Sequence, residues 1–255
     1  MKVRTLFTAF AVAVGTALAT AAGAAAAPAA DGGVTPFIVG GGNATQTYSF
    51  MVSLQSTTGS HFCGGSLIKA NWVVTAKHCV QGRTASSIRA RIGTTNRTSG
   101  GTVATGAQIV TNSSYDIALV RLSTSVSQTP IAVAASSGAV GTATRIIGWG
   151  QTCAPRGGCG APTILQELNT SIVSDGSCLG IYGAYEICTN NPNGNSGACY
   201  GDSGGPQIKS VNGVWQLIGA TSRAGNNNST CATGPSIYMD VPAFRSWISQ
   251  YAGTV

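Results

Sequence analysis

Acidic residues and histidines are scarce in this chain of 255 residues. It has only 7 Asp and Glu and 2 His, and charged residues make up 8% of the sequence. So few charges exclude a disordered polyelectrolyte, and the 35 glycines show no strict triplet repeat of the kind that forms collagen-like fibres. Any histidine-dependent chemistry must use His61 or His78, and Asp116 is the first acid after Asp31.

Clustered positive charge is also missing. The 14 Lys and Arg outnumber the acids and give a net charge of +7, but no run of five basic residues occurs. Because nucleic-acid binding needs basic charge gathered on one face, the sequence predicts no nucleic-acid partner.

Long apolar runs are absent after the N-terminus. Lys2 and Arg4 precede an apolar run over residues 6–27, which ends in Ala27-Pro28-Ala29. This pattern is typical of a secretory signal peptide with its cleavage site, and an uncleaved membrane anchor is the alternative. The weak hydrophobicity of Ala and Gly favours removal. We therefore expect a signal peptide over residues 1–29 and a secreted, extracellular protein that is free of the membrane and can form disulfides.

Short apolar segments bounded by Gly, Ser, Thr and Asn follow residue 37. They are rich in β-branched and aromatic residues, which is typical of strands. The main expected strands are 51–54, 72–74, 117–120, 145–147, 215–218 and 236–239. Asn212-Gly213 predicts a hairpin, because both central positions of its turn need φ > 0. Helical period occurs only at Phe244, Trp247, Ile248 and Tyr251. The chain is predicted to be all-β with one terminal helix, as a sandwich or a pair of barrels.

Three short segments carry residues that could do chemistry. His78 follows an apolar strand, whereas His61 lies in a polar turn where a solvated histidine is expected. Asp116 begins an apolar strand, where a carboxylate is costly to bury without a partner, and a role as a turn or strand-edge cap is the alternative. Residues 201–206 (GDSGGP) predict a tight turn that leaves the Ser203 hydroxyl accessible and brings N–H groups together.

These segments, in this order, resemble the chymotrypsin-like (trypsin-type) serine proteases. The resemblance covers most of residues 38–255 and is carried by six segments: 38–41 (IVGG), 63–68 (CGGSLI), 75–79 (TAKHC), 115–119 (YDIAL), 148–150 (GWG) and 202–206 (DSGGP). It implies two six-stranded antiparallel β-barrels with a C-terminal helix. The protease domain would span 38–255, with the first barrel at about 38–135, the second at about 136–240 and the helix at about 241–252.

The resemblance assigns roles by position in the family's motifs. Ser203 would be the nucleophile and His78 the base that takes its proton, while Asp116 would fix the imidazole tautomer and stabilise the imidazolium. The N–H groups of Gly201 and Ser203 would form the oxyanion hole, and Ser222 would also hydrogen-bond Asp116. Because the histidine must be neutral to act, activity is expected to rise through about pH 6.5.

The resemblance also implies a zymogen. Cleavage before Ile38 would free an amine that pairs with Asp202, and residues 30–37 would be a short activation leader. Asp202 buried without a cation is unfavourable, so the oxyanion hole is expected to be malformed until cleavage. Phe37 fits self-activation by an enzyme that prefers apolar residues. Because the amine must stay protonated, alkaline inactivation is expected.

All 8 cysteines are expected in disulfides, with a pairing that rests on the resemblance. The family bridges match Cys63 with Cys79, Cys178 with Cys188 and Cys199 with Cys231; if they hold, Cys153 pairs with Cys159. A zinc site would need regularly spaced ligands with a histidine nearby, which these cysteines lack. The stretch without acids before Asp116 argues against the calcium-binding loop that some relatives carry. No metal and no cofactor are expected.

The specificity pocket departs from the trypsin pattern. Trypsin-type enzymes carry an aspartate six residues before the nucleophile, where this chain has Gly197 followed by Ala198. A pocket without that carboxylate should not favour Lys or Arg. Ala224 and Ser236 fall where wall glycines often lie and narrow the pocket, so medium to large apolar residues are expected. Arg223 replaces a common cleft tryptophan, and its charge is expected to favour acidic residues at neighbouring subsites.

The sequence therefore predicts a secreted, monomeric serine endopeptidase. Its expected partners are protein or peptide substrates and protein inhibitors. An inactive relative that only binds is one alternative, against which the complete set of catalytic residues argues. A serine esterase of the α/β-hydrolase type is another, but that class has the order Ser, acid, His and alternating helices, whereas the order here is His, Asp, Ser.

Overall fold

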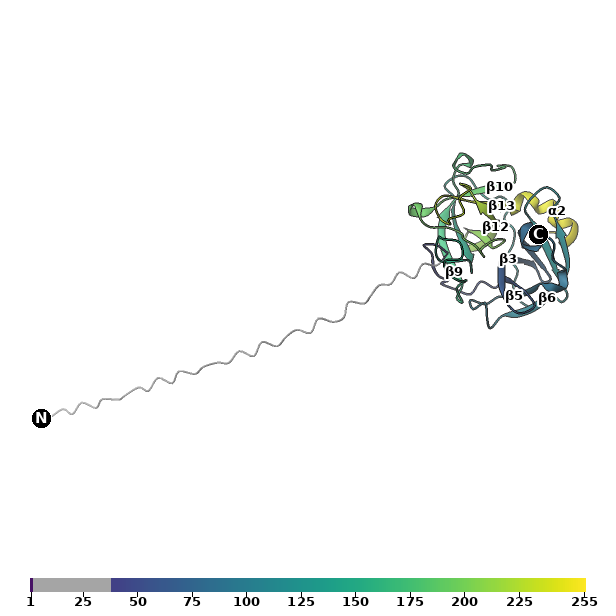
Figure 1. Cartoon of the computed structure of the whole chain (residues 1–255), viewed down its shortest axis with the longest axis horizontal. Coiled ribbons are helices and arrows are strands. Elements are labelled where there is room, and N and C mark those ends of the chain that lie inside the picture. The colour runs from purple at the N-terminus through teal and green to yellow at the C-terminus, as the bar shows by residue number, and fades with distance from the viewer. Residues whose placement is uncertain (2–37) are drawn as a thin grey trace. The chain divides into compact units, whose positions relative to one another are not determined.

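Six strands of the N-terminal half close into an antiparallel barrel. The computed structural model describes Met1 and residues 38–255 (Figure 1). The barrel order is β2 (Met51–Gln55), β3 (His61–Lys69), β4 (Trp72–Thr75), β7 (Ala118–Leu122), β6 (Thr102–Thr111) and β5 (Arg89–Ile92). Pairing of β2 with β5, with Val52 opposite Ile92, completes the ring. The prediction of a six-stranded first barrel is confirmed.

A second antiparallel sheet contains most of the C-terminal half. Its order is β1 (Gly42–Asn43), β9 (Gln166–Ser171), β8 (Ala143–Gly148), β11 (Pro206–Val211), β12 (Val214–Ala224), β13 (Ser236–Asp240) and β10 (Glu186–Thr189). The sheet thus has seven strands rather than the expected six, because β1 adds to the edge of β9. Ile172, just after β9, forms an isolated bridge with Thr189 in β10.

The β11–β12 hairpin has the turn that the sequence predicts. Only Asn212 and Gly213 separate the two strands, with φ of 51° and 80°. Left-handed backbone at both positions matches the right-handed twist of the flanking strands. The hairpin aligns β11, which follows Ser203, with β12, which carries Ser222.

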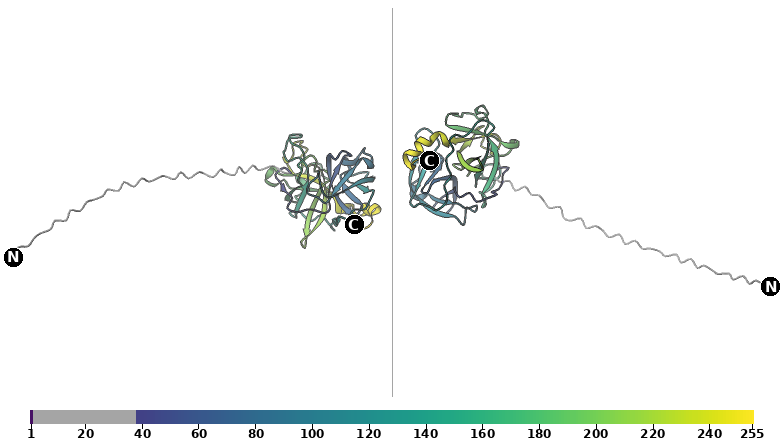
Figure 2. Two further views of the ribbon diagram at one scale, coloured as in Figure 1. Left: turned by 90° about the horizontal axis from the view of Figure 1, so that it is seen from below. Right: turned by 180° about the vertical axis from the view of Figure 1, so that it is seen from behind.

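One of the two α-helices found in residues 38–255 is not predicted by the sequence. The predicted C-terminal helix is present as α2 (Arg245–Ala252), preceded by the 3-10 turn η4 (Val241–Phe244). Its buried Ile248 belongs to the core cluster that includes the first barrel, and Figures 1 and 2 show α2 beside those strands. The other helix, α1 (Lys77–Val80), is one turn long and so shows no periodicity. Further 3-10 turns are η1 (Ala85–Ser87), η2 (Asp175–Ser177) and η3 (Pro192–Gly194).

A clasp of hydrogen bonds joins the two halves on one side. Arg97 donates from Nε to the carbonyl of Pro162 at 2.8 Å and from Nη2 to that of Ala161 at 2.9 Å. Nearby, the Leu165 N–H donates to the carbonyl of Thr95 at 2.7 Å. The loop after β5 is thereby fixed to the segment before β9.

The expected signal peptide (1–29) and leader (30–37) lie, Met1 apart, outside the described residues. No helix in the part of the chain that the structure describes is long and apolar enough to cross a membrane.

Candidate active site

Ser203 lies in a tight turn just before β11. Gly201 and Gly204 on either side of it have φ of 99° and 73°, a backbone region that favours glycine. A Cβ at Gly204 would lie 2.1 Å from Thr75 Oγ1, so the turn packs too closely on β4 for any larger residue. The Ser203 carbonyl accepts from the Gly64 N–H at 2.8 Å, which ties the turn to β3 of the first barrel.

His78 and Asp116 are joined by two hydrogen bonds. His78 Nδ1 lies 2.8 Å from Asp116 Oδ2, and the His78 backbone N–H donates to Asp116 Oδ1 at 2.9 Å. Ser222 Oγ donates to Asp116 Oδ2 at 2.7 Å. Since an ionised carboxylate only accepts, Nδ1 carries the proton and Nε2 is left free to accept one. Burial raises the Asp116 pKa, but the hydrogen bonds and charge of His78, together with Ser222, outweigh it and lower the pKa below its usual value.

A cavity of about 700 Å³ around Ser203 is lined by residues of both halves. Its lining includes His78 from the first half and Ser203 and Ser222 from the second. Among the expected pocket residues, Ala198, Ala224 and Ser236 line it, whereas Gly197 lies just behind, with room for a Cβ that would be 3.7 Å from Ser236 Oγ. No Asp or Glu is among the described residues that line this cavity.

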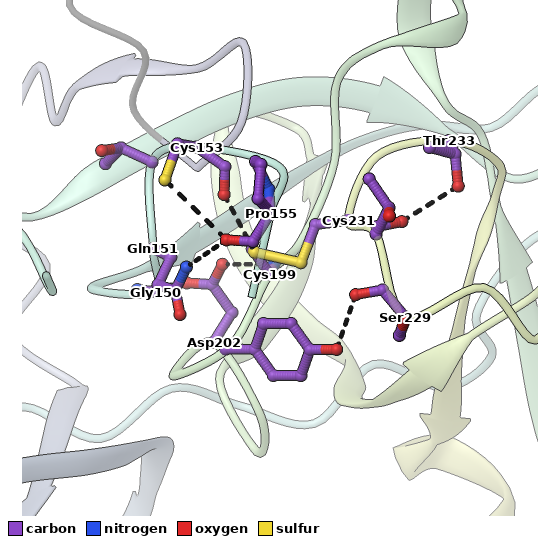
Figure 3. The surroundings of a disulfide bond; sticks show 12 residues. Gly150, Gln151, Cys153, Pro155, Cys199, Asp202, Ser229, Cys231 and Thr233 are labelled. Carbon is purple, nitrogen blue, oxygen red and sulfur yellow. Dashed lines mark hydrogen bonds between the residues drawn. A yellow bond between two sulfur atoms is a disulfide. The ribbon is translucent and has the colours of Figure 1, made fainter. Parts of the chain in front are cut away.

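Asp202 is buried beside this turn. It is 2% exposed, and its carboxylate accepts from the N–H groups of Gly150 at 2.8 Å and Cys199 at 2.9 Å (Figure 3). No cation pairs with it among the described residues. Burial raises the Asp202 pKa to about 7 although both N–H donors lower it. A Cβ at Gly150 would lie 2.3 Å from Asp202 Oδ2, which explains a glycine there.

Ile38, the expected partner of Asp202 after cleavage, is 1% exposed in a core cluster of the second half. Its neighbour Val39 accepts from the Gly197 N–H at 2.9 Å. The start of the expected protease domain is thus packed in the second half of the molecule and hydrogen-bonded to Gly197.

His61 differs from its expectation as a solvated residue. It is half-buried, its Nε2 lies 3.0 Å from the Gly201 carbonyl, and its Nδ1 lies 2.8 Å from Ser53 Oγ. Because the carbonyl only accepts, Nε2 donates and Nδ1 accepts from Ser53. Burial lowers the His61 pKa to about 4. No local pattern could reveal this contact, because Gly201 lies 140 positions away in the sequence.

Arg223, whose charge was expected to favour acidic residues at neighbouring subsites, is paired with Glu186. Its Nη1 donates to Glu186 Oε1 at 2.6 Å and its Nη2 to Oε2 at 2.9 Å. The pair borders a second hollow of about 560 Å³ on the other side of His78. The Glu186 side chain is 4% exposed and the Arg223 side chain 36%, so the acid is buried while the guanidinium reaches the surface.

The cysteines form four disulfides with the pairing that the resemblance implied. The bonds are Cys63–Cys79, Cys153–Cys159, Cys178–Cys188 and Cys199–Cys231. The one cluster of potential metal ligands found among the described residues is Cys63, His78 and Cys79. Both of its sulfurs are in a disulfide, so they cannot act as thiolate ligands.

Comparisons with known proteins identify the family. The family model described as Trypsin matches residues 38–248. Trypsin alpha of Drosophila erecta is 38% identical over 233 residues, covering 84% of this chain and 88% of the relative. Trypsin of Sarcophaga bullata is 34% identical over 237 residues, covering 84% and 89%. Trypsin Blo t 3 of Blomia tropicalis is 35% identical over 235 residues, covering 83% and 85%.

A barrel-and-sheet fold with a C-terminal helix and matches of this extent define a chymotrypsin-like serine protease. The chain belongs to the trypsin family and is a serine endopeptidase.

Proposed function

We propose that this protease hydrolyses peptide bonds through Ser203, His78 and Asp116. The observation that carries the proposal is the orientation of His78, whose Nδ1 is held by Asp116 while its ring borders the cavity that contains Ser203. His78 Nε2 takes the Ser203 proton as Oγ attacks the scissile carbonyl carbon. It then gives that proton to the leaving amine, which departs as the acyl-enzyme forms. Water, deprotonated by the same nitrogen, cleaves the ester and returns Ser203.

Gly201 and Ser203 are the proposed oxyanion-hole donors. Within the described residues, neither backbone N–H donates to a protein acceptor, although the neighbouring N–H groups of Asp202, Gly204 and Gly205 do. Two donors without a protein acceptor in the nucleophile turn can stabilise the negative charge that develops on the carbonyl oxygen, each by about 3 kcal/mol.

We propose a preference for apolar residues before the scissile bond. The relatives are named trypsins, but Gly197 stands at the position where trypsin-type enzymes carry an aspartate. The absence of acids from the lining of the cavity supports the same conclusion. A Lys or Arg side chain would be desolvated there without a counter-charge. Ala198, Ala224 and the Cys199–Cys231 disulfide offer apolar surface instead.

Cleavage before Ile38 is the proposed activation step. Asp202 is buried without a cation, and Ile38 lies in the same half of the molecule, so a new amine at Ile38 would supply the missing charge. We propose that the domain spans 38–255 after removal of the signal peptide (1–29) and leader (30–37), and that the protein is secreted. An Ile38-acetylated protein that is fully active would contradict this step.

The finer features of the fold and of its partners are also proposals. We propose that the second sheet closes as a barrel, supported by the Ile172–Thr189 bridge and by the Val173 N–H, which donates to the Cys188 carbonyl at 2.9 Å. We also propose that the protein is a monomer. Protein inhibitors are proposed to bind in the same cavity as substrates.

The test is turnover of a peptide library varied at the residue before the scissile bond, with protein that starts at Ile38. Cleavage after Phe, Tyr or Leu is expected, and Ser203→Ala should abolish both turnover and fluorophosphonate labelling. Cleavage after Lys or Arg would overturn the proposed pocket but keep the catalytic residues. Turnover that persists in Ser203→Ala would overturn the nucleophile.

A further inference from the structure

The second hollow beside His78 has two acids and one cation at its edge. Asp116 and Glu186 supply two acids, and Arg223 supplies a permanent cation. Tyr115 and Tyr182 also line this hollow. The ring of Tyr115 packs on that of Tyr185, with the ring centroids 4.3 Å apart. With His78 neutral, this edge carries one net negative charge, which belongs to the His78–Asp116 pair.

Glu186 holds the guanidinium of Arg223 away from that pair. Two nitrogens of Arg223 bond the two carboxylate oxygens, and Nη2 also donates to the Gly180 carbonyl at 2.9 Å. Glu186 Oε2 in turn accepts from the Tyr182 N–H at 2.8 Å. A bidentate pair of this kind fixes the plane and position of the guanidinium. Arg223 is therefore directed at the 180–186 segment rather than at substrate.

The charge of Arg223 is close enough to affect catalysis if it were not compensated. Arg223 and Asp116 border the same hollow, and the negative charges of Glu186 and Asp116 both raise the Arg223 pKa. A bare guanidinium there would partly neutralise Asp116 and repel the imidazolium that forms on His78. It would also attract an acidic side chain of a bound peptide.

We propose that Glu186 is a specificity-determining and positioning residue of this protease, which neutralises Arg223 so that the hollow beside His78 accepts uncharged rather than acidic substrate side chains. The inference rests on the proposed function, because it assigns the hollow to residues on the amino-terminal side of the scissile bond. It replaces the expectation that Arg223 favours acidic residues.

The experiment is Glu186→Gln in protein that starts at Ile38. Peptides with Glu, Gln or Lys at the second to fourth positions before the scissile bond are compared by kcat/KM. We expect the Glu-to-Gln ratio to rise about two- to fivefold, as for a partly exposed charge pair, and mainly through KM. The acidic limb of the pH–activity profile should move to lower pH, because the released cation disfavours protonated His78.

Two further variants test the charge argument. Arg223→Gln leaves Glu186 without a cation, so both effects should reverse, with Lys peptides favoured and the acidic limb at higher pH. The double variant Glu186→Gln/Arg223→Gln should restore the original ratio. Glu167→Gln is the matched control, because it breaks the Arg145–Glu167 pair (3.0 Å) between β8 and β9, which does not line the hollow, and should leave the ratio unchanged.

An unchanged ratio and pH profile in Glu186→Gln that still labels fully with fluorophosphonate would overturn the inference. If Glu186→Gln does not fold, Arg223→Gln provides the test. The inference is overturned if the Glu-to-Gln ratio and the acidic limb do not move in the opposite direction in that variant. Loss of Ser203-dependent turnover in the unmutated protein would instead overturn the proposed function on which the inference rests.

Discussion

His61 is half-buried and Asp202 is buried, both next to Gly201, and desolvation moves the pKa values of these two groups in opposite directions. His61 titrates near 4 in the folded chain instead of 6.5, and Asp202 near 7 instead of 3.8. Each shift favours the neutral form of its group, which needs no counter-charge in the interior. Their effects on folding stability therefore oppose each other over the same range of pH.

The first prediction follows from these two shifts, in the uncleaved Ser203→Ala chain. Between pH 4 and 6.5 the unfolded state binds more protons at His61, so that residue's contribution to the free energy of unfolding increases with pH, by up to about 3 kcal/mol. Between pH 4 and 7 the folded state binds more protons at Asp202, so its contribution decreases with pH, by up to about 4 kcal/mol.

Urea denaturation at pH 4.5 and 7 measures how the free energy of unfolding changes with pH. Relative to the parent, His61→Gln should make the free energy of unfolding fall more steeply with rising pH, and Asp202→Asn should make it rise. Equal slopes in all three proteins would contradict the pKa directions. Once cleavage supplies an amine for Asp202, the effect of Asp202→Asn should change sign, because the carboxylate is then stabilised in its charged form.

At the scale of elements, the loop between β8 and β9 supports the wall of the cavity. The Cys153–Cys159 bond closes this loop, which is hydrogen-bonded to two other segments, one before β11 and one between β12 and β13. The Gln151 N–H donates to the Tyr200 carbonyl at 2.8 Å, and the Cys231 N–H donates to the Ala154 carbonyl at 2.9 Å. Arg156 lies over the Tyr200 ring at 5.1 Å. Tyr200 and Cys231 both line the main cavity.

The second prediction is that Cys153→Ser/Cys159→Ser weakens substrate binding. Without the bond, the loop gains conformational freedom, and ordering it again on binding costs free energy. We expect KM to rise several-fold with little change in kcat, since among the described residues no hydrogen bond joins the loop to Ser203 or His78. Steady-state kinetics with the best library peptide measure this. A lower urea midpoint with unchanged KM would show that the bond serves stability alone.

Short-range patterns explain which elements the sequence predicted. The six expected strands are present in β2, β4, β7, β8, β12 and β13, with Ile117 one residue before β7, because alternating or continuous apolar segments between turn formers are local signals. The Asn212-Gly213 hairpin is equally local. The single turn of α1 and the addition of β1 to β9 were missed, since neither depends on a repeat within the segment itself.

At the scale of the whole molecule, the active-site cavity depends on how the two halves meet. His78 and Ser203 come from different halves, so their relative position depends on contacts such as the Arg97 clasp. In this clasp the charged side chain of Arg97, which belongs to the first half, donates to the carbonyls of Ala161 and Pro162 in the segment before β9.

The third prediction is that Arg97→Met lowers the free energy of unfolding by about 1–3 kcal/mol. The variant removes two hydrogen bonds from a charged donor and leaves the carbonyls of Ala161 and Pro162 without it. Urea denaturation measures the loss. Arg121→Met is the control, because Arg121 is exposed on β7 and has no hydrogen bond from its side chain to the described residues. Equal effects of the two variants would contradict a role for the clasp.

The sequence by itself determined six of the strands, the terminal helix and the segments that carry His78, Asp116 and Ser203, because these depend on local pattern and on short motifs. Only the tertiary structure decided the surroundings of the site. Glu186 pairs with Arg223 across 37 positions, and His61 reaches Gly201 across 140. Such contacts depend on which strands lie side by side and on how deeply each group is buried. Burial and pairing then decide whether a charge acts on substrate or is neutralised within the protein.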